Sequence, residues 1–121
     1  MPAKVKLEVL NGTWRGTAFV FRNPDECTVG RAPDCKIRFS LEREYIGVAR
    51  HHCIFDINPP DIYLRDLDST TGTFINERPV GSAKDVLNVV RNGDLVRAGP
   101  LLLAVEVNDD STESEQTSLF E

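Results

Sequence analysis

The sequence predicts an all-β fold, an antiparallel β-sandwich of about ten short strands. Short runs in which apolar and polar residues alternate recur along the chain, and a period of two is typical of strands that bury one face. Glycine, proline and asparagine separate these runs at close spacing, and no stretch shows the period of an amphipathic helix. The 121 residues suffice for one domain with its own core.

The N-terminal part is predicted to form a hairpin. Residues 5–9 place valine and leucine at alternate positions, with charged residues between them. Asn11-Gly12 follows and is a strong signal for a turn between antiparallel strands. The second strand is predicted at residues 16–21. Asn23-Pro24-Asp25 then interrupts the chain, because proline lacks an amide proton and restricts the residue before it.

The rest of the chain continues the same alternation of strands and turns. Residues 41–47 are predicted to be mostly loop, since the one helical turn that residues 41–45 could form is too short to be stable alone. Residues 77–91 are predicted to form a turn and a polar connection. The further strands are predicted at residues 27–29, 37–39, 52–57, 62–67, 73–75, 95–98 and 101–107.

A cluster of hydroxyl side chains joins two of these strands. Ser69, Thr70 and Thr71 follow the strand at 62–67, and Gly72 closes the cluster. Glycine lets the backbone bend and expose its amides. Hydroxyls beside free amides favour an anionic or strongly hydrogen-bonding ligand.

The net charge of −5 arises at the end of the chain. Residues 109–121 contain five acidic residues and no Lys or Arg, so residues 1–108 carry 14 basic and 14 acidic groups. Because residues 1–108 carry no net charge, their charge does not favour nucleic acid binding, and any anion site must be local. We therefore predict a domain at residues 1–108 and an acidic, disordered tail at residues 109–121.

Metal, membrane and secretion signals are weak. Cys27, Cys35 and Cys53 match neither a zinc knuckle nor a redox CxxC motif, so we expect reduced thiols and neither a metal nor a cofactor. His51 or His52 could join Cys53, but no second close ligand pair follows. No apolar run reaches the roughly 18 residues of a membrane helix, and the start lacks a secretory signal. We expect a cytoplasmic protein, or a nuclear one if its source is eukaryotic.

Four short motifs follow one another along the chain: Gly30-Arg31, Ala49-Arg50-His51-His52, the segment 66–76 and Asn92-Gly93-Asp94. Their order and spacing resemble the forkhead-associated (FHA) domain family over residues 5–107. The resemblance implies a sandwich of about eleven strands whose loops at one end bind phosphothreonine peptides. It also implies a signalling or adaptor role for the chain, whose partner is a protein or peptide phosphorylated on threonine, with a Ser/Thr kinase among the candidate partners.

The resemblance places the family's phosphate-binding arginine at Arg31, after Gly30; guanidinium can donate two parallel hydrogen bonds to phosphate. The family's Ser-Arg-X-His block falls on residues 49–52. There Ala49 lacks the serine hydroxyl, Arg50 keeps a charge, and His52 is expected to brace the loop.

The family's Ser-X-Asn-Gly block falls on Ser69, Thr70, Thr71 and Gly72. Thr70 matches a position that often contacts phosphate. Thr71 replaces an asparagine whose amide holds the peptide backbone with both a donor and an acceptor. A plainer interpretation is that Ser69 to Thr71 only satisfy turn amides, and that Arg31 is a solvated loop arginine.

Two functions stay open from the sequence. One is a phosphothreonine-dependent binding module of reduced affinity, because Ala49 and Thr71 depart from the family pattern. The other is a phosphate-independent docking or scaffold module. An enzyme is not expected, since no nucleophile-base pair, acid cluster or nucleotide loop occurs at usable spacing. Thr112 and Thr117 in the acidic tail could be phosphorylated and compete for the loops, or the tail could simply be solubilising.

Overall fold

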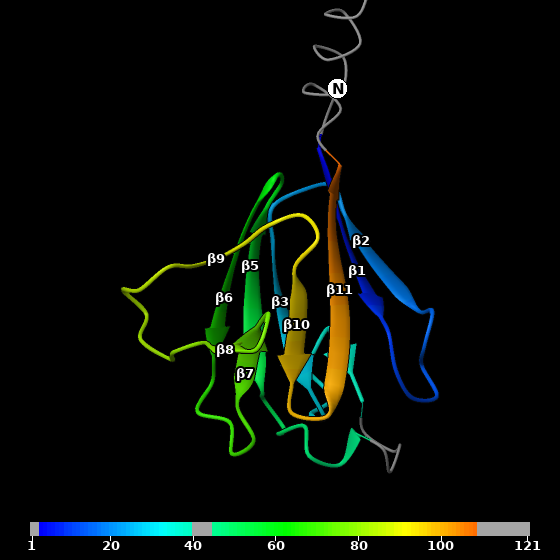
Figure 1. Cartoon of the computed structure of the whole chain (residues 1–121), viewed down its shortest axis with the longest axis vertical. Helices are drawn as coiled ribbons and strands as arrows, with labels where there is room; N and C mark the ends of the chain where they lie inside the picture. Colours follow the sequence, from blue (N-terminus) through cyan, green and yellow to red (C-terminus); the bar gives the residue numbers. More distant parts are fainter. Residues whose placement is uncertain (1–2, 40–44, 109–121) are drawn as a thin grey trace, which may run out of the picture.

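The computed structural model describes residues 3–39 and 45–108, and within these ranges the chain forms eleven strands in two sheets (Figure 1). One sheet contains β1 (Lys4–Val9), β2 (Ala18–Phe21), β7 (Thr73–Ile75), β8 (Arg78–Pro79), β10 (Leu95–Ala98) and β11 (Leu101–Asn108). The other contains β3 (Asp25–Gly30), β4 (Ile37–Arg38), β5 (Cys53–Asn58), β6 (Asp61–Asp66) and β9 (Asn88–Val90).

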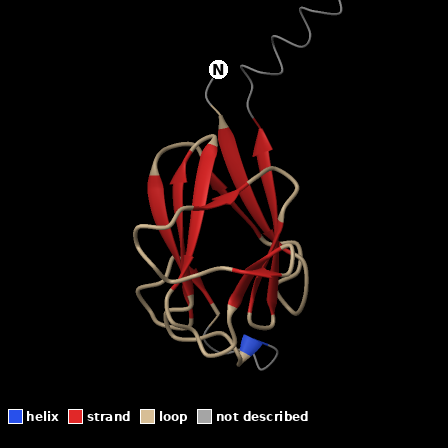
Figure 2. Cartoon of the chain, turned by 60° about the vertical axis from the view of Figure 1, so that its left-hand side comes forward, coloured by secondary structure: helices blue, strands red, loops and turns tan. Residues whose placement is uncertain are grey.

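The strand orders are β2-β1-β11-β10-β7-β8 and β4-β3-β5-β6-β9. All pairs are antiparallel except β3 with β4, which run parallel. The predicted N-terminal hairpin is present, with Leu7 opposite Phe19 across β1 and β2. Figure 2 shows the two sheets as separate layers. The predicted antiparallel β-sandwich is therefore confirmed.

The prediction for residues 77–91 is wrong in part, because this segment contains β8 and β9. Strand β8 has two exposed residues on the edge of its sheet, and β9 has three residues on the edge of the other. A period of two cannot be recognised in so few positions. The helical turn considered for residues 41–45 falls mainly outside the described residues, and the acidic tail lies entirely outside them.

Alternating side chains fill the space between the sheets. In β1, Val5, Leu7 and Val9 are fully buried, while the residues between them reach the surface. Each fully buried side chain of this size stabilises the fold by about 1.5–3 kcal/mol. The cysteines are buried free thiols, and burial raises the pKa of the Cys27 thiol to about 12.

An aromatic cluster holds Tyr45, in the segment that leads to β5. Tyr45 and Phe39 have ring centroids 4.8 Å apart, and Trp14 meets Phe39 edge-on at 5.6 Å. The Tyr45 hydroxyl donates to the Asn11 carbonyl at 2.7 Å and accepts from the Trp14 amide at 3.0 Å. Tyr45 is thus held by its ring, which packs against Phe39, and by its hydroxyl, which bonds to the backbone of Asn11 and Trp14. None of the described residues belongs to a helix with the length and apolarity needed to cross a bilayer.

Candidate functional site

Three loops meet at the end of the sandwich drawn at the bottom of Figure 1. Strands β3 and β6 end where β5 begins, since Cys53 pairs with both Val29 and Asp66. The loops after β3, before β5 and after β6 therefore lie together. They carry every residue that the sequence assigned to ligand binding.

The loop after β3 is joined by its backbone to the loop before β5. The Arg31 amide donates to the Ala49 carbonyl at 3.1 Å, and the Ala32 amide donates to the Arg50 carbonyl at 3.0 Å. A Cβ atom on Gly30 would collide with the Arg50 carbonyl oxygen. Glycine at position 30 is therefore required by close packing, which places Arg31 directly beside residues 49 and 50.

The Arg31 side chain is half-buried and anchored at one nitrogen. Its Nε donates to the Val48 carbonyl at 2.6 Å. Its two terminal nitrogens make no hydrogen bond or ion pair with any described residue. The guanidinium group is thus held in place, while its two terminal nitrogens stay available to an anion.

Arg50 supplies a second positive charge at the same place. Its side chain is exposed and forms no ion pair within residues 3–39 and 45–108. The neighbouring His51 is exposed too, and its Nε2 lies 2.9 Å from Asp34. This bond to His51 is the main reason why the pKa of Asp34 is lowered.

His52 is fully buried and connects two loops. Its Nδ1 accepts from the Ala49 amide at 3.0 Å, and its Nε2 lies 2.8 Å from the Gly72 carbonyl. An amide can only donate and a carbonyl can only accept, so these partners require the proton on Nε2. The structure therefore places His52 as a brace between the loops, where a ligand cannot reach it.

Asp66 organises the hydroxyl cluster, a role that the sequence analysis did not assign. The carboxylate is 8% exposed and accepts from the Ser69 amide at 3.0 Å and from the Thr73 hydroxyl at 2.6 Å. The Ser69 hydroxyl also donates to Asp66, and it accepts from the Gly72 amide at 3.0 Å. The available signal was an acid three residues before a serine, which is typical of side-chain-capped turns.

Thr70 and Thr71 differ in what they leave free. The Thr71 hydroxyl donates to the Gly47 carbonyl at 2.7 Å and so joins the loop after β6 to the loop before β5. Gly72 has a φ of 87°, which favours glycine in this turn. The exposed Thr70 hydroxyl has no partner among the described residues. Of the three clustered hydroxyls, the one on Thr70 is uncommitted.

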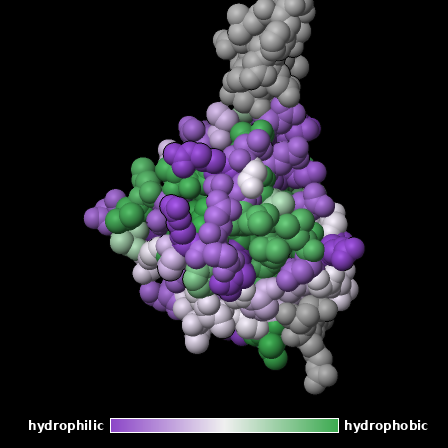
Figure 3. Space-filling model, in the orientation of Figure 1, coloured by the Kyte–Doolittle hydropathy of each residue, from purple (hydrophilic) through white to green (hydrophobic). Residues whose placement is uncertain are grey.

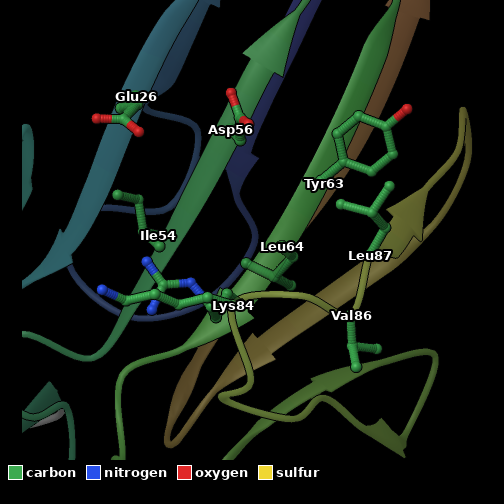
Figure 4. A pocket seen from close by; sticks show the side chains of 9 residues that line it. Glu26, Ile54, Asp56, Tyr63, Leu64, Lys84, Val86 and Leu87 are labelled. Atoms are coloured by element: carbon green, nitrogen blue, oxygen red, sulfur yellow. The ribbon is translucent and has the colours of Figure 1, made fainter.

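A hollow elsewhere on the molecule is less suited to an anion. It has a volume of about 250 Å³ and lies over the outer face of β5 and β6 (Figure 4). Its charged lining residues have both signs, since Glu26 and Asp56 are acidic and Arg65 and Lys84 are basic. Val86, Leu87 and Val89, in the segment beside this hollow, are exposed apolar residues. Figure 3 shows the face seen in Figure 1, on which hydrophobic and hydrophilic residues both reach the surface.

Comparisons with known proteins point to one family. The family model of the FHA domain matches residues 27–99. The glycogen accumulation regulator GarA of Mycolicibacterium smegmatis is 31% identical over 108 residues, which cover 89% of this chain and 62% of GarA. The E3 ubiquitin-protein ligase CHFR of Danio rerio is 36% identical over 83 residues, which cover 67% of this chain and 12% of CHFR. The chain thus spans less than two thirds of these relatives.

Solved structures agree in fold. A structure described as an analysis of phosphothreonine-dependent FHA domain interactions matches with a TM-score of 0.69 and 27% identity, covering 85% of this chain and 95% of its own. The FHA domain of FhaA, in complex with the intracellular domain of another protein, matches with a TM-score of 0.68 and 27% identity. That match covers 84% of this chain and 99% of the FhaA domain.

Proposed function

Since the chain belongs to the FHA domain family, we propose that it is a phosphothreonine-dependent peptide-binding module in signalling. The observation that carries this proposal is the Arg31 guanidinium, fixed through Nε to Val48 with its terminal nitrogens uncommitted. Arg50, in the loop before β5, and Thr70, in the loop after β6, are both exposed at the same end of the sandwich. The partner is a protein phosphorylated on threonine by a Ser/Thr kinase, and the chain binds rather than catalyses.

The side chains of the three loops divide into two groups. Arg31 anchors the phosphate, Arg50 contributes charge, and Thr70 supplies a second contact through its free hydroxyl. The remaining residues hold the loops through the contacts described above: Gly30, His52, Ser69, Thr71 and Gly72. The assignment gives Ser69 and Thr71 a supporting part, because both hydroxyls already have partners within the fold.

We expect this chain to bind a phosphothreonine peptide library and not the unphosphorylated library. Phosphate adds charge and three strong acceptor oxygens, which Arg31 and Arg50 can meet. Titration of both libraries against the full chain, followed by fluorescence anisotropy, measures the difference. Equal binding of both libraries by folded protein would contradict phosphate dependence.

Restoring a hydroxyl at position 49 is expected to strengthen phosphopeptide binding. A charge-assisted hydrogen bond contributes about 1.5–3 kcal/mol, so Ala49→Ser should lower the Kd roughly ten- to a hundredfold. The Ala49 amide already donates to His52, so the new hydroxyl is not needed by the loop. Ala83→Ser, in the exposed segment between β8 and β9, is the matched control. An Ala49→Ser affinity equal to that of Ala83→Ser would mean that phosphate does not approach residue 49.

Phosphate-independent docking is the second candidate. It is favoured by the methyl group of Ala49 and by Thr71, whose hydroxyl is bound to Gly47 instead of facing a peptide. Beside Gly47, Ile46 is 76% exposed and could contact an apolar partner. The titration separates the two functions, since a docking module of this type would bind without phosphate and without Arg31.

A further inference from the structure

Two of the three loops also contain a cluster of three potential metal ligands, none of which is assigned to peptide binding. Asp34 and Cys35 belong to the loop after β3, and His51 belongs to the loop before β5. One ligand atom from each residue lies within 4.8 Å of those from the other two. The sequence analysis considered His51 only with Cys53, because the distance along the chain hides its proximity to Cys35.

The chemistry of this cluster suits zinc. Thiolate sulfur, imidazole nitrogen and carboxylate oxygen are the three ligand types of protein-bound zinc, and soft thiolate disfavours magnesium and calcium. Zinc bonds of about 2.0–2.3 Å in a tetrahedron place ligand atoms roughly 3.3–3.8 Å apart. The Asp34 and His51 ligand atoms lie 2.9 Å apart and all three ligand atoms lie within 4.8 Å of one another, so this spacing lies between the distances already present.

One ligand of the cluster is held by the fold, and the other two have exposed side chains. Cys35 is 7% exposed and held in the loop, with its amide donating to the Ala32 carbonyl at 3.1 Å. The Asp34 and His51 side chains are 73% and 48% exposed, so they can turn toward a metal without disturbing the core. From this geometry we propose that Asp34, Cys35 and His51 bind a zinc ion, with a fourth coordination position open to solvent.

Neighbouring charges act on the Cys35 thiol and on any cation bound beside it. Burial raises the pKa of the Cys35 thiol, Asp34 acts in the same direction, and the nearby charges of Arg38 and Arg50 oppose it. The negative charges of the thiolate and carboxylate ligands would counteract the repulsion between a bound cation and the two arginines. The thiol also donates to the Arg50 carbonyl at 3.2 Å, and zinc would take the place of that proton.

The first test uses cobalt as a spectroscopic substitute for zinc in the full, reduced chain. We expect one equivalent of Co²⁺ to produce a thiolate-to-metal charge-transfer absorption that Zn²⁺ abolishes. Cys35→Ser should remove this absorption, whereas Cys27→Ser, which alters a buried thiol outside the cluster, should retain it. A folded wild-type chain without the absorption would overturn the proposal.

The second test uses the two exposed ligands, whose replacement is not expected to affect folding. Asp34→Asn and His51→Asn should each weaken zinc binding at least about tenfold, the lower end of the effect of losing even an outer-shell partner. Asp61→Asn, an exposed acid on β6, is the control and should bind like the wild type. Unchanged zinc affinity in both Asp34→Asn and His51→Asn would assign the metal to another part of the chain and overturn the proposed site.

Discussion

Replacing Arg31 with alanine is expected to weaken phosphothreonine peptide binding at least about a hundredfold. The terminal nitrogens of this side chain can donate two charge-assisted hydrogen bonds, each contributing about 1.5–3 kcal/mol. A loss of about 3 kcal/mol corresponds to roughly a hundredfold in Kd. The bond from Nε to the Val48 carbonyl at 2.6 Å should strengthen the effect, because the fork is oriented before the ligand arrives.

The measurement is a titration of wild type, Arg31→Ala and Arg31→Lys with one phosphothreonine peptide. Lysine keeps the charge but not the planar fork, so Arg31→Lys should lie between the other two. Arg22→Ala is the matched control, since Arg22 is exposed and follows β2 at the opposite end of the sandwich. Thermal unfolding checks that Arg31→Ala is folded. Phosphate-dependent binding that survives Arg31→Ala would leave the function standing and assign the anchor to another residue.

The fold was predictable wherever burial alternates over several residues. Strand β1 shows this pattern because valine and leucine face the core and charged residues face outward along its full length. Strands β8 and β9 could not be predicted, since they have two and three residues and are defined by pairing at sheet edges. The parallel pairing of β3 with β4 likewise depends on how the intervening loop folds back.

The site was predictable as a set of residues but not as a set of contacts. The resemblance to the FHA family predicted that Arg31, Arg50 and Thr70 lie in loops at one end of the sandwich. The bond from Thr71 to Gly47 spans loops from different parts of the chain, and its cause is tertiary. The same holds for the approach of His51 to Asp34, which no local pattern indicates.

Replacing Asp66 with alanine is expected to cost about 3 kcal/mol of unfolding free energy, the largest stability effect among the loop residues. The carboxylate is 8% exposed and accepts hydrogen bonds from Ser69 and Thr73. Bonds to a charged acceptor contribute about 1.5–3 kcal/mol each, and bonds that share one acceptor are not additive. For a domain of this size, 3 kcal/mol corresponds to a fall in Tm of about 10–20 °C.

Chemical denaturation of Asp66→Ala, Asp66→Asn and Asp56→Ala measures this effect. Asparagine keeps the shape and one acceptor oxygen, so Asp66→Asn should be intermediate. Asp56 is exposed on the adjoining strand β5, and its replacement should change stability by less than about 0.5 kcal/mol. Equal stability of Asp66→Ala and Asp56→Ala would show that these hydrogen bonds do not hold the loop.

Asp66→Ala should also weaken phosphopeptide binding, although Asp66 is too enclosed to contact a ligand. Asp66 fixes Ser69, and the Ser69 hydroxyl fixes the Gly72 amide, so the turn that presents Thr70 rests on one carboxylate. His52 holds the Gly72 carbonyl from the other side. A loosened turn must be ordered again by the ligand, which lowers affinity without removing a contact. Affinity measured where Asp66→Ala remains folded should therefore fall less than in Arg31→Ala, and it should recover in part in Asp66→Asn.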